Sequence, residues 1–140
     1  MPRMLFKGKR IDNNEWVKGY YVRKIDPLTN ISRSFILIQE REINPITGKP
    51  SIFKSVMTWY EVIPETVSRN TGVPDSKGNL LFENDIIKEG CNNLIGVIVE
   101  DKSTGGFKLK DFGEDYNIKD APIEWTFLGN VFDNSELLKK

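Results

Sequence analysis

The chain has 140 residues, of which 20 are Lys or Arg and 20 are Asp or Glu, and 39% of its residues are hydrophobic. This composition allows a packed core in one domain, or in one domain with a small appendage. The absence of His and the single Cys, Cys91, exclude Ser–His–Asp and Cys–His catalysis, imidazole metal sites and an intrachain disulfide. Because no apolar run has the length of a signal peptide or a membrane span, we expect a soluble cytoplasmic protein without a membrane partner.

The charges are unevenly distributed along the chain. Residues 1–70 contain 12 Lys or Arg and 7 Asp or Glu, whereas residues 71–140 contain 8 Lys or Arg and 13 Asp or Glu. The positive excess of the first half lies within residues 1–24. Such a basic segment suits a polyanion, or the acidic half of the same chain or of a neighbouring copy.

The N-terminal region is predicted to form a β-hairpin. Two extended segments, Met4–Arg10 and Glu15–Arg23, flank three residues that favour a turn, Asp12, Asn13 and Asn14. Alternation along the second segment places an aromatic residue on each of its faces. Burial on one face alone is therefore not expected.

A second hairpin is predicted further along the chain. Ser34–Gln39 has the apolar character of a buried strand, which Glu40, Arg41 and Glu42 end in solvent. Residues 44–50 form a loop with two Pro and one Gly, and residues 51–63 are rich in β-branched and aromatic residues. We expect residues 34–43 and 51–63, on either side of this loop, to pair as a hairpin.

The middle of the chain is dominated by turn signals. Residues 64–72 are predicted to be extended, although Pro64 and Gly72 would also suit one or two helical turns. A tight turn is expected at residues 75–79, followed by a strand over residues 80–88 that is interrupted at residues 83–85.

The C-terminal half is predicted to contain several short strands. In chain order we expect a turn at residues 90–93, a strand at 94–100, a turn at 101–105, a strand at 106–110, an acidic loop at 111–120, a strand at 123–132 and a capped helical turn at 134–140.

This spacing predicts a mainly β protein with little helix, the C-terminal half being a small SH3-like barrel over about residues 72–133. The predicted division places β-hairpins in residues 1–63 and a barrel-like region in residues 64–140. One integrated domain, or an α+β fold, is the alternative.

Carboxylates gather near the central turn, at Asp75, Glu83 and Asp85. They could hold a divalent metal or act as an acid–base pair. The run from Asp75 does not fit a calcium loop, because Lys77 stands at its third position and Ile86, instead of a bidentate Glu, stands at its twelfth. We therefore interpret them as turn residues and predict no catalytic, metal or cofactor site.

The basic N-terminal segment also carries aromatic residues. Cations could follow phosphates while rings stack on bases, or the rings could belong to a core below a solvated face. The candidate nucleic-acid or partner surface consists of Lys7, Lys9, Arg10, Trp16, Lys18, Tyr20, Arg23 and Lys24.

Three motifs stand at the start, middle and end of the chain. The opening motif is Leu5-Phe6-Lys7-Gly8-Lys9-Arg10 followed by Trp16-Val17-Lys18-Gly19-Tyr20. The middle motif is Pro64-Glu65-Thr66-Val67 followed by the turn residues Thr71, Gly72, Asp75, Gly78, Glu83, Asn84 and Asp85. The closing motif is Gly129-Asn130-Val131-Phe132 followed by Asn134 and Leu137-Leu138. Together the three motifs resemble the YopX protein family of phages and prophages.

The family has Gly where this chain has Asn84, and Asn also accepts left-handed backbone. The resemblance implies a phage or prophage accessory protein in a bacterial cytoplasm, and it transfers no catalytic residue. We expect a non-enzymatic module that binds a protein partner or itself as a homo-oligomer. The alternative is a nucleic-acid-binding accessory factor. No cofactor or small-molecule substrate is expected.

Overall fold

The computed structural model describes residues 5–89, 94–110, 115–117 and 124–138. The chain folds into two compact units, one comprising Met4–Val67 and the other containing Ser68–Lys140. Each unit is described by itself. The predicted turn at residues 90–93, and the acidic loop apart from residues 115–117, lie outside the described residues.

Four antiparallel strands build the first unit, in the order β4-β3-β2-β1. They are β1 (Phe6–Lys9), β2 (Trp16–Ile25), β3 (Ser32–Ile43) and β4 (Pro50–Val62). The turns between them contain Asn14, Asn30 and Gly48, each with a positive φ that Asn and Gly adopt readily. Both predicted hairpins are therefore confirmed.

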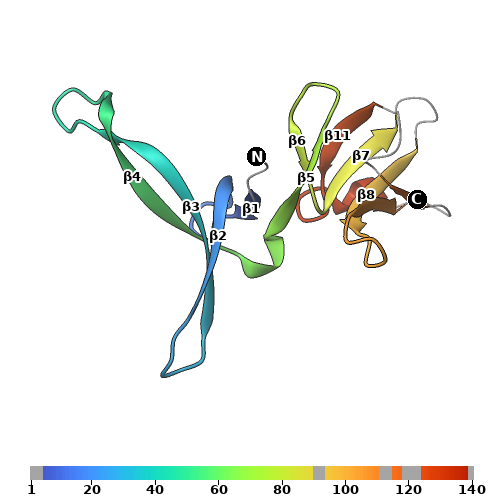
Figure 1. Ribbon diagram of the computed structural model, residues 1–140, viewed down its shortest axis with the longest axis horizontal. Helices are drawn as coiled ribbons and strands as arrows, with labels where there is room; N and C mark the ends of the chain where they lie inside the picture. Colours follow the sequence, from blue (N-terminus) through green and yellow to red (C-terminus); the bar gives the residue numbers. More distant parts are fainter. Residues whose placement is uncertain (1–4, 90–93, 111–114, 118–123, 139–140) are drawn as a thin grey trace. The chain divides into compact units, whose positions relative to one another are not determined.

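The second hairpin pairs close to the predicted segments, but β3 does not end where the sequence predicted. The expectation that β3 ends at Gln39 is wrong, because Glu40 pairs with Val56 and Arg41 with Ser55. The Glu40 carboxylate accepts hydrogen bonds from the hydroxyls of Thr58 and Tyr60, so a charged residue is held inside the hairpin. Since β2 pairs with β3 only as far as Leu37, β3 and β4 continue beyond it as a two-stranded ribbon (Figure 1).

The end of β4 returns to the residues that follow β1. Val62 forms a bridge with Arg10, Ile63 donates its N–H to the Lys9 carbonyl, and Ile11 donates to the Glu61 carbonyl. Ile36 and Val62 are fully buried. They belong to one face of the sheet, which is the core face of this unit.

Residues 64–72, predicted to be extended, divide into two conformations. Pro64–Thr66 forms a short 3-10 helix, so the prediction is wrong there, and β5 (Ser68–Pro74) is extended as predicted. Pro64 suits the first helical position, and the N–H of Thr66 reaches the Ile63 carbonyl at 3.0 Å.

The second unit contains a hairpin and a five-stranded antiparallel sheet. Pro74 of β5 pairs with Leu80 of β6 (Leu80–Phe82). The sheet order is β10-β9-β8-β7-β11. Its strands are β7 (Asp85–Glu89), β8 (Ile95–Glu100), β9 (Phe107–Lys110), β10 (Asp115–Asn117) and β11 (Trp125–Asn130). The core of the unit is formed by Leu81, Ile87, Ile98, Phe107, Leu109 and Trp125.

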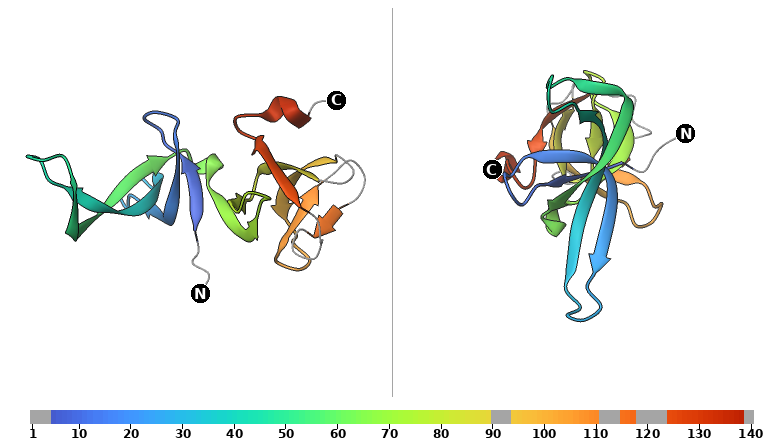
Figure 2. Two further views of the ribbon diagram at one scale, coloured as in Figure 1. Left: turned by 90° about the horizontal axis from the view of Figure 1, so that it is seen from above. Right: turned by 90° about the vertical axis from the view of Figure 1, so that its left-hand side faces the viewer.

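The prediction of a mainly β fold is confirmed. A short 3-10 helix, Ser135–Leu138, follows β11 where a helical turn was expected (Figure 2, red). Strand β10 was missed, because three residues that include Asp and Asn are too short and polar to give a strand signal. Among the described residues β10 and β11 are the outer strands of the sheet, and they do not pair with each other to close a barrel. The SH3-like barrel therefore stays a prediction.

Candidate interaction surfaces

The strand register gathers most of the predicted basic and aromatic residues on one face of the first unit. Residues directly opposite each other in a sheet share a face, as do alternate residues of one strand. Lys7 is opposite Lys18 and Lys9 is opposite Trp16, while Lys24 is opposite Arg33. The resulting basic–aromatic face consists of Lys7, Lys9, Trp16, Lys18, Tyr20, Lys24, Arg33, Phe35 and Trp59.

Cations lie over aromatic rings along this face. The Lys7 ammonium is 5.0 Å from the centre of the Trp16 ring, and the Lys24 ammonium is 4.5 Å from that of Trp59. The Arg33 guanidinium is 5.3 Å from the Phe35 ring, which meets Trp59 edge-on at 5.6 Å. These distances are those of cation–π contacts.

Sequence reasoning missed Arg33, Phe35 and Trp59 as members of this face. Their positions follow from the pairings of Lys24 with Arg33, and of Leu37 with both Tyr20 and Trp59. The only signal available in the sequence was the alternation within β3 and β4.

Two predicted residues lie elsewhere. Arg23 is opposite Ser34 and belongs to the other face. Arg10 follows β1, its guanidinium lies 4.4 Å from the Tyr60 ring, and it forms a paired hydrogen bond with Asp12 at 2.6 and 2.9 Å. This contact holds the pKa of Asp12 below its ordinary value.

Ion pairing changes which cations can attract an anion. Arg33 donates two hydrogen bonds to Glu61, at 2.6 and 3.1 Å, and thereby lowers the pKa of that carboxyl group. Lys7 is buried, whereas Lys18 and Lys24 are exposed. Two exposed cations of the face, Lys18 and Lys24, thus lie on β2.

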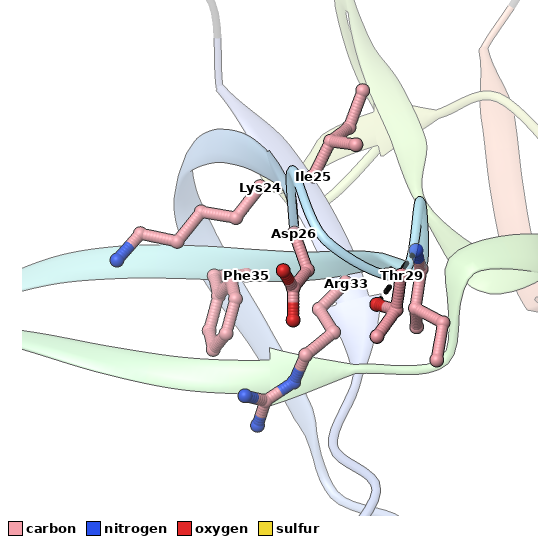
Figure 3. Close-up of a pocket in the computed structure, with 7 residues that line it drawn as sticks. Lys24, Ile25, Asp26, Thr29, Arg33 and Phe35 are labelled. Atoms are coloured by element: carbon pink, nitrogen blue, oxygen red, sulfur yellow. Dashed lines mark hydrogen bonds between the residues drawn. The ribbon is translucent and has the colours of Figure 1, made fainter.

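The face continues into a hollow at the end of the β2–β3 hairpin. The hollow has a volume of about 380 Å³ and is lined by Lys24, Ile25, Asp26, Thr29, Ile31, Arg33 and Phe35. Figure 3 shows the Lys24 side chain extending away from those of Asp26 and Arg33. Both charge signs are present, so the hollow is less suited to a simple anion than the face beside it.

The second candidate surface is the β4 edge, defined as residues 55–60 of β4 on the side away from β3. In an antiparallel strand, successive residues direct their N–H and C=O groups to opposite sides. Glu61 and Ile63 direct theirs away from β3, toward residues 9–11. Ser55, Met57 and Trp59 therefore direct their backbone groups to the β4 edge.

Apolar side chains are exposed along the same strand. Val56, Met57 and Trp59 are 43%, 47% and 44% exposed, and Ile52 and Phe53 near the tip of the ribbon are more exposed still. In the described sheet β4 is an outer strand. Backbone hydrogen-bonding groups and apolar side chains thus lie together at one edge.

The predicted carboxylate cluster forms turns in the second unit. The Asp75 carboxylate accepts hydrogen bonds from the N–H groups of Lys77 and Asn79, both at 2.9 Å. The Thr71 hydroxyl donates to the Leu81 carbonyl at 2.8 Å. Gly72 and Gly78 have positive φ.

The turn before β7 also uses its polar side chains internally. Asn84 has a φ of 72°, the left-handed conformation that was expected for it. The buried Asp85 carboxylate accepts the N–H of Phe82 at 2.8 Å, and Glu83 faces Arg69 at 3.9 Å. These bonds favour a structural role, rather than ligand binding, for the turn residues of the middle motif.

The described part of the chain contains no group of three or more Cys, Asp or Glu placed to share a metal ion. In the same residues, no helix has the length and apolar character needed to cross a membrane.

A family model described as YopX protein matches residues 28–139. The chain belongs to the YopX family. The match includes the middle and closing motifs, whereas the opening motif lies before the matched range. No curated protein matches the chain. Membership therefore rests on the segment that runs from the β2–β3 turn to the C-terminal end.

Proposed function

We propose that this YopX-family protein is a non-enzymatic binding module that associates with a second copy of itself. The β4 edge carries the proposal, because it combines directed backbone groups with exposed Val56, Met57 and Trp59. An uncovered edge strand is a template for pairing with another chain. The family also supports an accessory role in a phage or prophage.

The limited stability of the two-stranded β3–β4 ribbon also favours association with a partner. A two-stranded hairpin in water is only marginally stable, and a third strand or a packing surface stabilises it. From Ile38 onward β3 pairs with β4 alone. A second copy would supply the missing strand.

Amide hydrogen exchange tests this function. The N–H groups of Met57 and Trp59 point to the β4 edge, whereas that of Thr58 points to β3. We expect all three N–H groups to be protected from exchange at high protein concentration. On dilution, the exchange rates of Met57 and Trp59 are expected to rise at least about tenfold, while Thr58 stays protected. Rapid exchange of Met57 and Trp59 at every concentration would overturn the proposal.

The basic–aromatic face favours a second function, binding of single-stranded nucleic acid. Exposed Lys18 and Lys24 would follow phosphates, and the half-exposed rings of Tyr20 and Trp59 offer surfaces for base stacking. The geometry suits a single strand better than a duplex, because rings can stack only on unpaired bases.

Reversing two of these charges tests nucleic-acid binding. Lys18→Glu with Lys24→Glu is expected to weaken binding of a labelled single-stranded oligonucleotide about tenfold or more at low salt, and to reduce its salt dependence. The matched control, Lys77→Glu with Lys102→Glu, makes the same charge change at exposed sites of the other unit. Equal weakening by both pairs, or no binding at low salt, would contradict this function.

A further inference from the structure

The β4 edge can pair with the β4 edge of a second copy about a two-fold axis. In an antiparallel pair of identical strands the axis passes beside one residue, which then faces its own counterpart. The position of the axis is set by the length of edge that both copies leave open.

Two features of the first unit limit that length. At one end, Ile11 donates its N–H to the Glu61 carbonyl, so the edge is occupied from Glu61 onward. At the other end, the register with β3 shifts after the pair of Arg41 with Ser55, so regular backbone stops at Ser55. The outward groups between these limits belong to Ser55, Met57 and Trp59, and Met57 is their midpoint.

We propose that β4 pairs antiparallel with β4 of a second copy, with Met57 facing Met57. The inference rests on the self-association proposed above and names its contact. Ser55 then faces Trp59 of the other copy, and Val56 faces Thr58. The three pairs of outward-directed residues would exchange about six backbone hydrogen bonds.

The side chains fit this register. A small residue, Ser55, stands opposite a large one, Trp59, and the β-branched Val56 and Thr58 face each other, a pairing that sheets favour. Val56, Met57 and Trp59 would all gain a neighbouring strand. The register therefore covers the exposed apolar side chains of the regular part of the edge.

Charge complementarity supports the same register. Lys54, one residue beyond the regular segment, would lie near Tyr60 of the other copy, whose hydroxyl donates to Glu40 at 2.9 Å. Glu40 also accepts from Thr58 at 3.1 Å, so its carboxylate leans over β4 toward the edge. The long Lys54 side chain can reach this carboxylate across one strand spacing, and the symmetry repeats the contact.

Neighbouring registers fit less well. An axis at Thr58 sets Ser55 opposite Glu61, whose carbonyl already accepts from Ile11. An axis at Val56 sets Trp59 opposite Phe53, which lies in the irregular part of β4. A two-fold axis perpendicular to the sheet also keeps the basic–aromatic faces of both copies on the same side.

Disulfide trapping tests the register. Met57→Cys is made in a Cys91→Ser chain, with Val56→Cys and Thr58→Cys as matched controls one residue away. Facing residues lie at about 5.5 Å between Cα atoms, which suits a disulfide, whereas each control residue lies beyond about 7 Å from its own counterpart. We expect at least about fivefold more covalent dimer from Met57→Cys than from either control.

The outcomes separate the register from self-association. Dominant linkage of Val56→Cys or Thr58→Cys would overturn the register while leaving association intact. Linkage of none of the three in a chain that light scattering shows to be dimeric would overturn pairing through β4. Linkage of none in a monomeric chain would overturn the proposed function as well.

Discussion

Replacing Met57 with Pro is expected to raise the dissociation constant of the dimer at least about a hundredfold, so that a dimer at micromolar concentration becomes a monomer. The Met57 N–H points to the β4 edge. Pro removes this donor and places its ring at the centre of the proposed contact. Proline is tolerated where the N–H faces away from the neighbouring strand, so the pairing with β3 loses no hydrogen bond.

The matched control is Met57→Ala, which keeps the N–H and removes most of the side chain. Light scattering on both variants separates backbone pairing from apolar contact. Dissociation by Pro but only a modest effect of Ala is the expected result. A dimer that survives Met57→Pro, with an unchanged melting temperature, would show that the copies associate elsewhere.

Replacing Gly19 with Ala is expected to lower the free energy of unfolding of the first unit by about 2–4 kcal/mol. A Cβ at Gly19 would lie 2.2 Å from the Leu37 carbonyl oxygen and 3.1 Å from Ile36. The carbonyl belongs to the backbone of β3, so relief requires β2 and β3 to move apart. The basic–aromatic face depends on the same pairing.

Urea denaturation followed by tryptophan fluorescence measures this effect in a Trp125→Phe chain, because the two remaining Trp residues, Trp16 and Trp59, both lie in the first unit. Gly106→Ala is the control, since its new Cβ would meet only the Thr104 hydroxyl, at 3.6 Å, in the other unit. An unchanged unfolding midpoint for Gly19→Ala would contradict the described packing of β2 against β3.

The sequence was sufficient to predict the β class and most strands of the first unit. Alternation in β2 predicted an aromatic residue on each of its faces, and Tyr20 and Tyr21 do lie on opposite faces. Alternation is a local property, because it depends only on neighbouring residues of one strand. It therefore predicts the members of a face within a strand.

The composition of a face across several strands depends on register, which a single sequence specifies weakly. Arg33, Phe35 and Trp59 joined the basic–aromatic face only when the pairing of β3 with β2 and β4 was known. The same limit applies to Glu40. It was expected to end β3, but the hydroxyls of Thr58 and Tyr60 on the neighbouring strand hold its carboxylate inside the hairpin.

The roles of turn residues were easier to predict from the sequence than the position of an open strand edge. Asp75 and Asn84 have the backbone bonds and the left-handed conformation that their residue types favour. The β4 edge could not be predicted, because an open edge exists only relative to the rest of a sheet. It required the sheet order and the direction of the Glu61 and Ile63 backbone groups.

Self-association is tested most directly by the mass of the unmodified chain in solution. Light scattering coupled to size exclusion, over a dilution series, is expected to give about twice the chain mass of 16.1 kDa at high concentration and to approach 16.1 kDa on dilution. A constant 16.1 kDa at every concentration, up to the solubility limit, would contradict the account.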